Sequence, residues 1–221
     1  MKIVAIQGSP HGMKGNTGRM LERLIASATD AGAEVTTFLL GEMNVRPCRA
    51  CDVCHRVGTC PQPDDFATIY NAMRAADGIV LASPNYIFSV TAQMKCLMDR
   101  CCGPLHVQSL ADKHAAAVVT SGGQESAPVE QYMLRFLRAL GCWTVGSVGA
   151  EAWKLADNFA KVEALAPAAE LGGRLAEAIK SRQTFPEQEA ERSAFRDRMR
   201  EIVMMRKDEW AFEYEHWQAM P

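Results

Sequence analysis

Long apolar stretches are absent from this chain of 221 residues, and so is a large excess of charge of either sign. No apolar run approaches the roughly 20 residues that a helix needs to span a bilayer, so no membrane partner is expected. The formal net charge of -2 gives no sign of a nucleic-acid partner. The first residues lead into a strand-like run without the apolar core of a signal peptide, and we therefore expect a cytoplasmic protein.

Two common nucleotide-binding motifs are missing as well. The glycine-containing segment at residues 8–17 is neither G-x-G-x-x-G nor a Walker A sequence, because no Gly-Lys-Ser/Thr occurs. A dinucleotide or ATP is therefore not favoured at this segment. Internal repeats and low-complexity segments are also absent. The length predicts one substantial domain with an appended tail.

Strand-like and helix-like segments alternate along residues 1–183. Strands are predicted at residues 2–7, 34–40, 78–82, 115–120 and 143–148. Helices are predicted at residues 17–31, 91–100, 127–140 and 162–181, with a further helix through Ile69, Met73 and Ala76 that Asp64 and Asp65 would cap. This alternation requires right-handed crossovers, and it predicts an α/β fold with a doubly wound, five-stranded parallel sheet.

Residues 184–221 differ in composition from the predicted domain. Residues 187–209 are rich in charge and carry one narrow apolar face, and four aromatic residues follow, namely Trp210, Phe212, Tyr214 and Trp217. Aromatic side chains this dense need a partner surface. The extension is predicted to be helical, and its aromatic residues either pack on their own domain or contact a second subunit.

Four of the eight cysteines lie close together in a loop at residues 47–61, with the spacing C-x2-C-x2-C-x5-C. They are Cys48, Cys51, Cys54 and Cys60. Overlapping C-x2-C steps let a short loop direct three thiolates at one centre, as in cubane iron–sulfur sites. Zinc sites more often use two separated Cys-x2-Cys pairs. Iron and sulfur are therefore favoured, with zinc, free thiols or disulfides as alternatives.

The other four cysteines lie among apolar residues. They are Cys96, Cys101, Cys102 and Cys142. A free cysteine in such surroundings usually behaves as a small buried hydrophobic residue. We therefore expect all four to be core thiols.

Unusual loops follow three of the predicted strands. Residues 8–17 place Gly, Ser, Asn and Thr directly before a helix, which is typical of a phosphate site, although a turn capped by Asn16 or Thr17 would look similar. Residues 83–88 include Tyr86 and Phe88, which could flank a flat ring or belong to a local core. Two glycines at residues 120–124 allow close approach to the backbone. Because ligands bind beyond the carboxyl ends of the strands in this fold, FMN fits best.

Four segments of the sequence, three of them in these loops, together resemble the NAD(P)H-dependent FMN reductase group of flavodoxin-like proteins. They are GSP…GNT over residues 8–17, SPNY over residues 83–86, K-x3-DR at Lys95, Asp99 and Arg100, and TSGG over residues 120–123. The cysteine motif, followed by Asp64 and Asp65, is similar to the iron–sulfur flavoprotein branch of that group. The resemblance covers roughly residues 1–180.

The resemblance implies the sheet order 2-1-3-4-5, FMN at the carboxyl ends of the strands, a [4Fe–4S] cluster in the loop after the second strand, and a homodimer or homotetramer. The residues it assigns to FMN are Ser9, His11, Gly15, Asn16, Thr17, Ser83, Pro84, Asn85, Tyr86, Ile87, Ser121, Gly122 and Gly123. The residues it assigns to the cluster are Cys48, Cys51, Cys54 and Cys60.

The expected function is that of an FMN-dependent oxidoreductase. Electrons would pass from a ferredoxin-like donor through the cluster and FMN to a small acceptor. One alternative is an NAD(P)H-dependent FMN, quinone or nitroaromatic reductase without a cluster, and another is a non-catalytic electron carrier or redox sensor. The sequence nominates no acid–base catalytic residue.

Overall fold

The centre of the computed structural model, which describes residues 1–123, 125–155 and 158–220, is a parallel sheet with the strand order β2-β1-β3-β4-β5. The strands are β1 (Lys2–Gln7), β2 (Glu34–Leu39), β3 (Gly78–Pro84), β4 (His114–Ser121) and β5 (Trp143–Glu151). All neighbouring pairs are parallel, which confirms the predicted flavodoxin-like fold class. Strands β3 and β5 continue past their predicted ends because β4 pairs with both up to Pro84 and Glu151.

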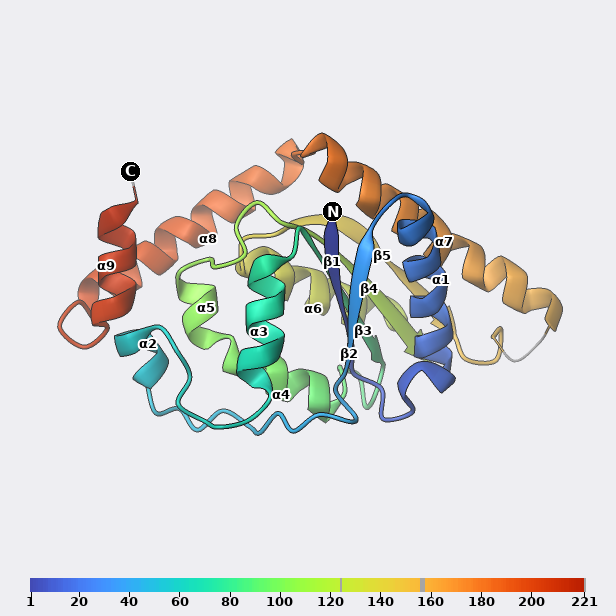
Figure 1. The fold of residues 1–221 in the computed structure, drawn as a ribbon, viewed down its shortest axis with the longest axis horizontal. Coiled ribbons are helices and arrows are strands. Elements are labelled where there is room, and N and C mark those ends of the chain that lie inside the picture. The colour runs from blue at the N-terminus through green and yellow to red at the C-terminus, as the bar shows by residue number, and fades with distance from the viewer. Residues whose placement is uncertain (124, 156–157, 221) are drawn as a thin grey trace.

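Helices connect the strands and extend beyond the last one (Figure 1). The longer helices are α1 (Asn16–Asp30), α3 (Phe66–Ala75), α4 (Ala92–Arg100), α6 (Ser126–Ala139), α7 (Asn158–Ser181) and α8 (Pro186–Met205). The shorter ones are η1 (Gly12–Lys14), α2 (Val53–Val57), α5 (Cys102–His106) and α9 (Ala211–Ala219). Helices α2 and α5 were not predicted, because helices this short carry no readable periodicity.

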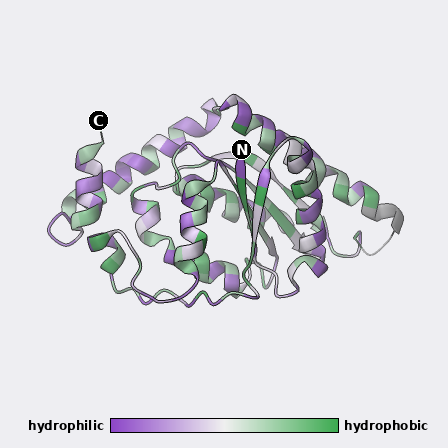
Figure 2. Cartoon of the chain, viewed as in Figure 1, coloured by the Kyte–Doolittle hydropathy of each residue, from purple (hydrophilic) through white to green (hydrophobic). Residues whose placement is uncertain are grey.

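The helices cover both faces of the sheet. Ile3 and Ala5 point to the face that α1 and α7 cover, whereas Val4 and Ile6 point to the face that α3, α4 and α6 cover. Every residue of β3 and β4 is therefore buried, and both strands are apolar over most of their length (Figure 2). This agrees with the continuous apolar runs expected of central parallel strands.

The C-terminal extension packs on its own chain. Helix α8 leads away from α7 along one side of the molecule, and α9 then lies beside α2 (Figure 1). Trp210 and Trp217 are only 8% and 3% exposed and form a small core with Met199 and Val203. For these two tryptophans, the first of the two expected alternatives holds.

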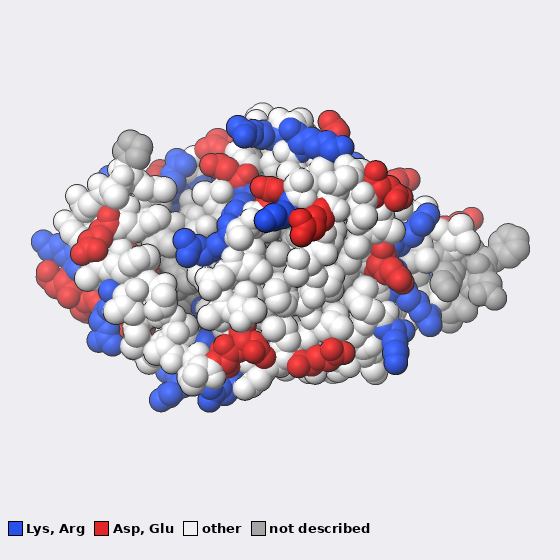
Figure 3. All heavy atoms as spheres, in the orientation of Figure 1, with Lys and Arg blue, Asp and Glu red and all other residues white. Residues whose placement is uncertain are grey.

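On the face seen in Figure 3, acidic and basic side chains are interspersed. Within the residues that the structure describes, no helix is both long enough and apolar enough to cross a membrane.

Helices α1 and α7 approach each other closely at Gly172. A Cβ atom at Gly172 would overlap the carbonyl group of Leu24 in α1, whereas a Cβ at the neighbouring Gly173 would meet only the hydroxyl of Ser27 at 3.5 Å. We expect Gly172→Ala to lower the free energy of unfolding by about 1–3 kcal/mol, because the helices must separate. Gly173→Ala should be neutral, or stabilising by up to about 1 kcal/mol through helix propensity.

Urea denaturation followed by circular dichroism would measure both free energies. Equal effects of the two substitutions would show that the helices do not depend on this close approach.

Candidate functional site

The three loops singled out in the sequence meet at the carboxyl ends of β1, β3 and β4. The hydroxyl groups of Thr17 and Thr120 lie 2.6 Å apart and join the first loop to the third. The backbone N–H of Asn85 donates to the carbonyl oxygen of Thr120 at 2.7 Å, which joins the second loop to the third. Thr91, which caps α4, donates its hydroxyl to the carbonyl oxygen of Gly8 at 2.7 Å. The expected ligand edge is therefore one connected surface.

The first loop leaves the start of α1 open to an anion. The N-cap residue is Gly15, which has no side chain to accept from the first-turn N–H groups, so the expected alternative of a turn capped by Asn16 or Thr17 does not hold. Those N–H groups lie at the positive end of a helix of 15 residues. Ser9 is buried and its hydroxyl accepts from the backbone N–H of His11 at 3.2 Å, while His11 itself is exposed.

The second loop combines exposed apolar side chains with an unpaired buried acceptor. Tyr86, Ile87 and Phe88 are 44%, 90% and 78% exposed, so they do not form a local core. The side-chain nitrogen of Asn85 donates to the carbonyl oxygen of Glu125 at 3.1 Å. Its side-chain oxygen is buried and has no hydrogen-bond partner within the described part of the chain. A heterocycle that offers an N–H group would satisfy this oxygen.

Three other residues predicted at this edge are Ser83, which stabilises its backbone, and Gly122 and Gly123, which leave space for a ligand. Ser83 is fully buried, and its hydroxyl donates to the carbonyl oxygen of Pro84 at 2.9 Å and accepts from the N–H of Thr91 at 3.1 Å. Its hydroxyl therefore shapes the turn. A Cβ atom added at Gly122 or Gly123 would meet nothing within 4 Å. The open helix start, the unpaired amide oxygen and this open backbone fit a phosphorylated flat heterocycle such as FMN.

The four cysteines of the motif line a second site. One pocket of about 300 Å³ lies at the C-terminal end of α4, and it is bordered by Cys48, Cys51, Cys54 and Cys60 together with Cys102. Cys48 and Cys51 are exposed and Cys54 and Cys60 are half-buried, and none of the four is in a disulfide. Four thiols around one open pocket are a donor set that fits a thiolate-bound metal or cluster.

A buried ion pair closes the cysteine loop at its base. Both ends of the Arg100 guanidinium bind the carboxylate of Asp64, at 2.7 and 3.1 Å. The same guanidinium donates to the carbonyl oxygen of Arg46 at 3.0 Å, and Asp64 accepts from the N–H of Arg46 at 3.0 Å. Burial alone would raise the pKa of Asp64, but the hydrogen bonds from Arg100 and Arg46 hold this pKa below its usual range.

Asp64 and Asp65, which follow the cysteine motif, do not mainly cap α3 as predicted. Asp65 is the N-cap of α3 but makes no side-chain capping bond, and instead its carboxylate accepts from the N–H of Asn44 at 2.7 Å. Asp64 does accept from the N–H of Phe66 at 3.2 Å, although its main partner is Arg100. Both carboxylates therefore fasten the ends of the cysteine loop.

Helix α4 connects the two sites. It starts at the expected ligand edge with Thr91 as its cap, and it ends with Arg100, which lines the cysteine pocket. Its 9 residues rise about 14 Å, at about 1.5 Å per residue. Within one chain, the two sites are therefore one short helix apart.

Sequence reasoning missed several residues at the cysteine pocket. Cys101 and Cys142 are buried as expected and Cys96 is only half-buried, but Cys102 is exposed and borders the pocket, so its assignment to the core was wrong. Cys102 begins the short helix α5. His55 and Glu213 were also missed; they are 158 positions apart and in contact, and no local pattern reports such a pair.

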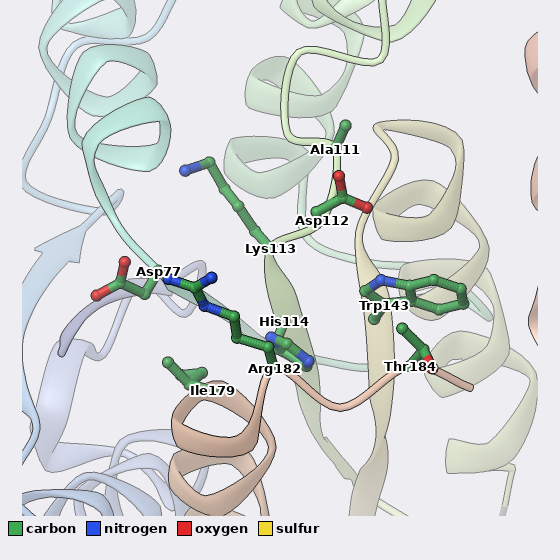
Figure 4. A pocket seen from close by; sticks show the side chains of 9 residues that line it. All are labelled: Asp77, Ala111, Asp112, Lys113, His114, Trp143, Ile179, Arg182 and Thr184. Carbon is green, nitrogen blue, oxygen red and sulfur yellow. The ribbon is translucent and has the colours of Figure 1, made fainter.

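A further pocket, of about 490 Å³, lies at the opposite edge of the sheet (Figure 4). It is bordered by residues that precede or begin β3, β4 and β5 and by the end of α7. Two of its charged side chains already have partners: Asp77 accepts from the N–H of Lys2 at 2.8 Å, and Lys113 donates to the carbonyl oxygen of Ala76 at 2.5 Å. This pocket is remote from all the predicted residues.

Comparisons with known proteins bear on the family and the fold of this chain. The family model described as NADPH-dependent FMN reductase matches residues 1–154. An iron–sulfur flavoprotein of Archaeoglobus fulgidus is 33% identical over 186 residues, which cover 82% of each chain. One of Methanocaldococcus jannaschii is 37% identical over 131 residues, covering 57% of this chain and 67% of the relative. The solved structure of an NAD(P)H:quinone oxidoreductase from Methanothermobacter marburgensis superposes with a TM-score of 0.61 at 16% sequence identity. The superposition covers 79% of this chain and 98% of the other chain, so the two proteins share the fold.

Helix α4 carries two ion pairs that differ in burial, and they offer a matched test. We expect Arg100→Met to lower the free energy of unfolding by about 3–5 kcal/mol, because it removes the buried guanidinium and leaves the charge of Asp64 with only the half-exposed Arg46 side chain, at 3.8 Å, as a cationic neighbour. Lys95→Met breaks the exposed pair with Asp99 and should cost less than about 1 kcal/mol.

Chemical denaturation would give both values. If Arg100→Met were as mild as Lys95→Met, the cysteine loop would not depend on this buried pair.

Proposed function

Because this chain belongs to the NADPH-dependent FMN reductase family, in its iron–sulfur flavoprotein branch, we propose that it transfers electrons from a ferredoxin-like donor to a small acceptor through a [4Fe–4S] cluster and FMN. The protein is an FMN-dependent oxidoreductase. The observation that carries the proposal is that all four cysteines of the motif border one pocket beside α4, the helix that starts at the flavin edge.

FMN would lie at the strand ends with its phosphate at the start of α1. Ser9, Asn16 and Thr17 lie there beside uncapped N–H groups, with His11 and Gly15 at the rim. The ring would lie between the exposed loop of Tyr86 and Ile87 and the open backbone of residues 121–123. The unpaired side-chain oxygen of Asn85 would then accept from the ring.

The spacing of the cysteines favours a cluster over a single zinc ion. Four sulfur atoms at about 2.3 Å from a tetrahedral ion lie about 3.8 Å from one another. Among the ligand atoms of the described residues, only those of His55, His106 and Glu213 form a group of three or more within 4.8 Å of one another, so no three of the cysteine sulfurs lie that close together. A larger inorganic group suits such a spacing better.

FMN and the cluster together would determine which electron transfers the protein carries out. FMN exchanges electrons singly or in pairs and a cluster exchanges them one at a time, so together they connect one-electron donors with two-electron acceptors. The residues of the chain would bind and orient: the cysteines ligate, α1 holds the phosphate, and Arg100 keeps the cysteine loop closed. We also expect a homodimer or homotetramer, which the exposed apolar side chains of Ile87 and Phe88 support.

A second candidate function is reduction of FMN, quinones or nitroaromatic compounds with NAD(P)H and without a cluster. The description of the matching family model, NADPH-dependent FMN reductase, favours it.

Substitution within the motif tests the assignment of the ligands. Cys51→Ala should lose iron, acid-labile sulfide and the broad visible absorbance of the cluster, while FMN stays bound at the separate strand-end site. Cys102→Ala is the matched control, because Cys102 borders the same pocket but lies outside the motif, and this variant should keep all three signals. An unchanged spectrum in Cys51→Ala would contradict cluster ligation by the motif.

Anaerobic purification followed by metal analysis and a donor assay tests the function itself. We expect about four irons per chain together with a flavin spectrum. A reduced ferredoxin should reduce the flavin much faster than NADPH does. Flavin without iron, combined with rapid oxidation of NADPH, would instead establish the second candidate. Iron and flavin without turnover of any acceptor would point to an electron carrier.

A further inference from the structure

A pocket of about 290 Å³ between α6 and α8 is lined mainly by arginines. Arg135 and Arg138 belong to α6, whereas Arg192 and Arg198 belong to α8. Glu191 is the only acidic residue among the described residues that border this pocket. The chain as a whole has a formal net charge of -2, so this concentration of positive charge does not follow from a basic composition.

Hydrogen bonds and an ion pair fix the two walls of the pocket. Near the start of α8, the side-chain oxygen of Gln188 accepts from the backbone N–H of Thr144 at 3.0 Å, and its side-chain nitrogen donates to the carbonyl oxygen of Thr144 at 2.8 Å. Because Thr144 lies in β5, these bonds fasten α8 to the sheet. Farther along α8, the carboxylate of Glu191 lies 3.0 Å from Nε of Arg138 in α6. The pocket is therefore bounded by elements that are held in place.

Arg192 is a buried cation with an unused donor. Its side chain is 10% exposed, and its guanidinium carbon lies 3.5 Å from the centre of the Trp143 ring. Nη2 lies 3.4 Å from the carboxylate of Asp112, whereas Nη1 is buried without a hydrogen-bond partner among the described residues. Burial lowers the pKa of Arg192, and the charges of Asp112 and Glu189 oppose this shift only in part. A buried donor without a partner costs free energy, which a bound acceptor would recover.

Two other arginines of the pocket carry charge that nothing nearby neutralises. Arg135 and Arg198 are both exposed, and neither forms an ion pair with another residue in the described part of the chain. Glu191 and Asp112 each balance one of the remaining two guanidinium groups. The charges of Arg135 and Arg198 are therefore available to an anion from outside the chain.

The arrangement favours a phosphate group as this anion. A guanidinium presents parallel N–H donors that match the oxygens of a carboxylate or a phosphate. A carboxylate has only two oxygens, whereas a phosphate monoester has three terminal oxygens that arginines from both walls can share. Its charge of about -1.5 to -2 at neutral pH would balance Arg135 and Arg198 together. Phe195, whose ring lies 5.9 Å from the guanidinium of Arg198, gives the organic part of such a molecule an apolar surface.

We propose that the pocket between α6 and α8 binds a small phosphorylated molecule, with its phosphate held by Arg135, Arg192 and Arg198. The pocket is distinct from the FMN edge, because Arg135 lies about 14 Å along α6 from Ser126, the first residue after that edge, at about 1.5 Å per residue. Helix α8 leads to α9, which lies beside α2 of the cysteine loop. A ligand that joins α8 to α6 would therefore stabilise the extension that covers this loop.

Isothermal titration calorimetry of the full-length protein, saturated with FMN so that the start of α1 is occupied, tests this site. The probes are inorganic phosphate and phenyl phosphate, and acetate is the carboxylate control, all at one ionic strength set with sodium chloride. We expect phenyl phosphate to bind more tightly than inorganic phosphate, because its ring can contact Phe195, and we expect no binding of acetate.

Single substitutions then locate the binding. Arg135→Gln and Arg198→Gln, one on each wall, should each weaken the binding of phenyl phosphate about tenfold, because each removes a charge-assisted hydrogen bond. Arg200→Gln is the matched control, since Arg200 is exposed on α8 outside the pocket, and its affinity should equal that of the wild type. Circular dichroism would verify that these exposed substitutions leave the fold unchanged.

Three outcomes would overturn the proposal. The first is the absence of binding heat from both phosphate compounds in the wild type. The second is an unchanged affinity in both Arg135→Gln and Arg198→Gln, which would place the binding elsewhere. The third is a ferredoxin that binds through these arginines while phenyl phosphate does not bind, which would make the pocket a protein-docking surface. None of these results depends on iron content or electron transfer, so the proposed function is tested separately.

Discussion

The buried ion pair between Arg100 and Asp64 is the interaction on which the cysteine site depends. The segment between β2 and α3 has only the short helix α2 as regular structure, so little else fixes its path. Arg100 holds both ends of this segment, through the carboxylate of Asp64 and the carbonyl oxygen of Arg46. A charge buried in this way costs free energy unless its partner is present, and the pair therefore selects one closed arrangement of the loop.

The position of Arg100 also couples the two candidate sites. Arg100 ends α4, and Thr91 at the other end of that helix donates its hydroxyl to the carbonyl oxygen of Gly8 in the loop after β1. A helix is stiff along its axis, so the expected ligand edge and the cysteine pocket keep a fixed separation. For a protein proposed to pass electrons between two cofactors, such a fixed separation matters as much as the ligands themselves.

The C-terminal extension completes the cysteine site. Trp210 stacks on His55 and His106, and Phe212 packs so closely against Gly58 that a Cβ atom at Gly58 would overlap its ring. Glu213 adds the carboxylate that both histidines need. Two of the four aromatic residues that made the tail conspicuous in the sequence, Trp210 and Phe212, thus cover the loop that holds the four cysteines of the motif.

The sequence by itself determined the order of strands and helices, and it predicted a ligand edge at the strand ends and a site at the four cysteines. Periodicity, loop composition and motif spacing are local properties, and the rule that parallel strands bind ligands at their carboxyl ends turns them into a site. Only the tertiary structure decided that Asp64 pairs with Arg100, that Cys102 borders the pocket, and that Glu213 reaches His55 across 158 positions. The partner of a buried charge is chosen by packing between distant segments, and no local pattern records that choice.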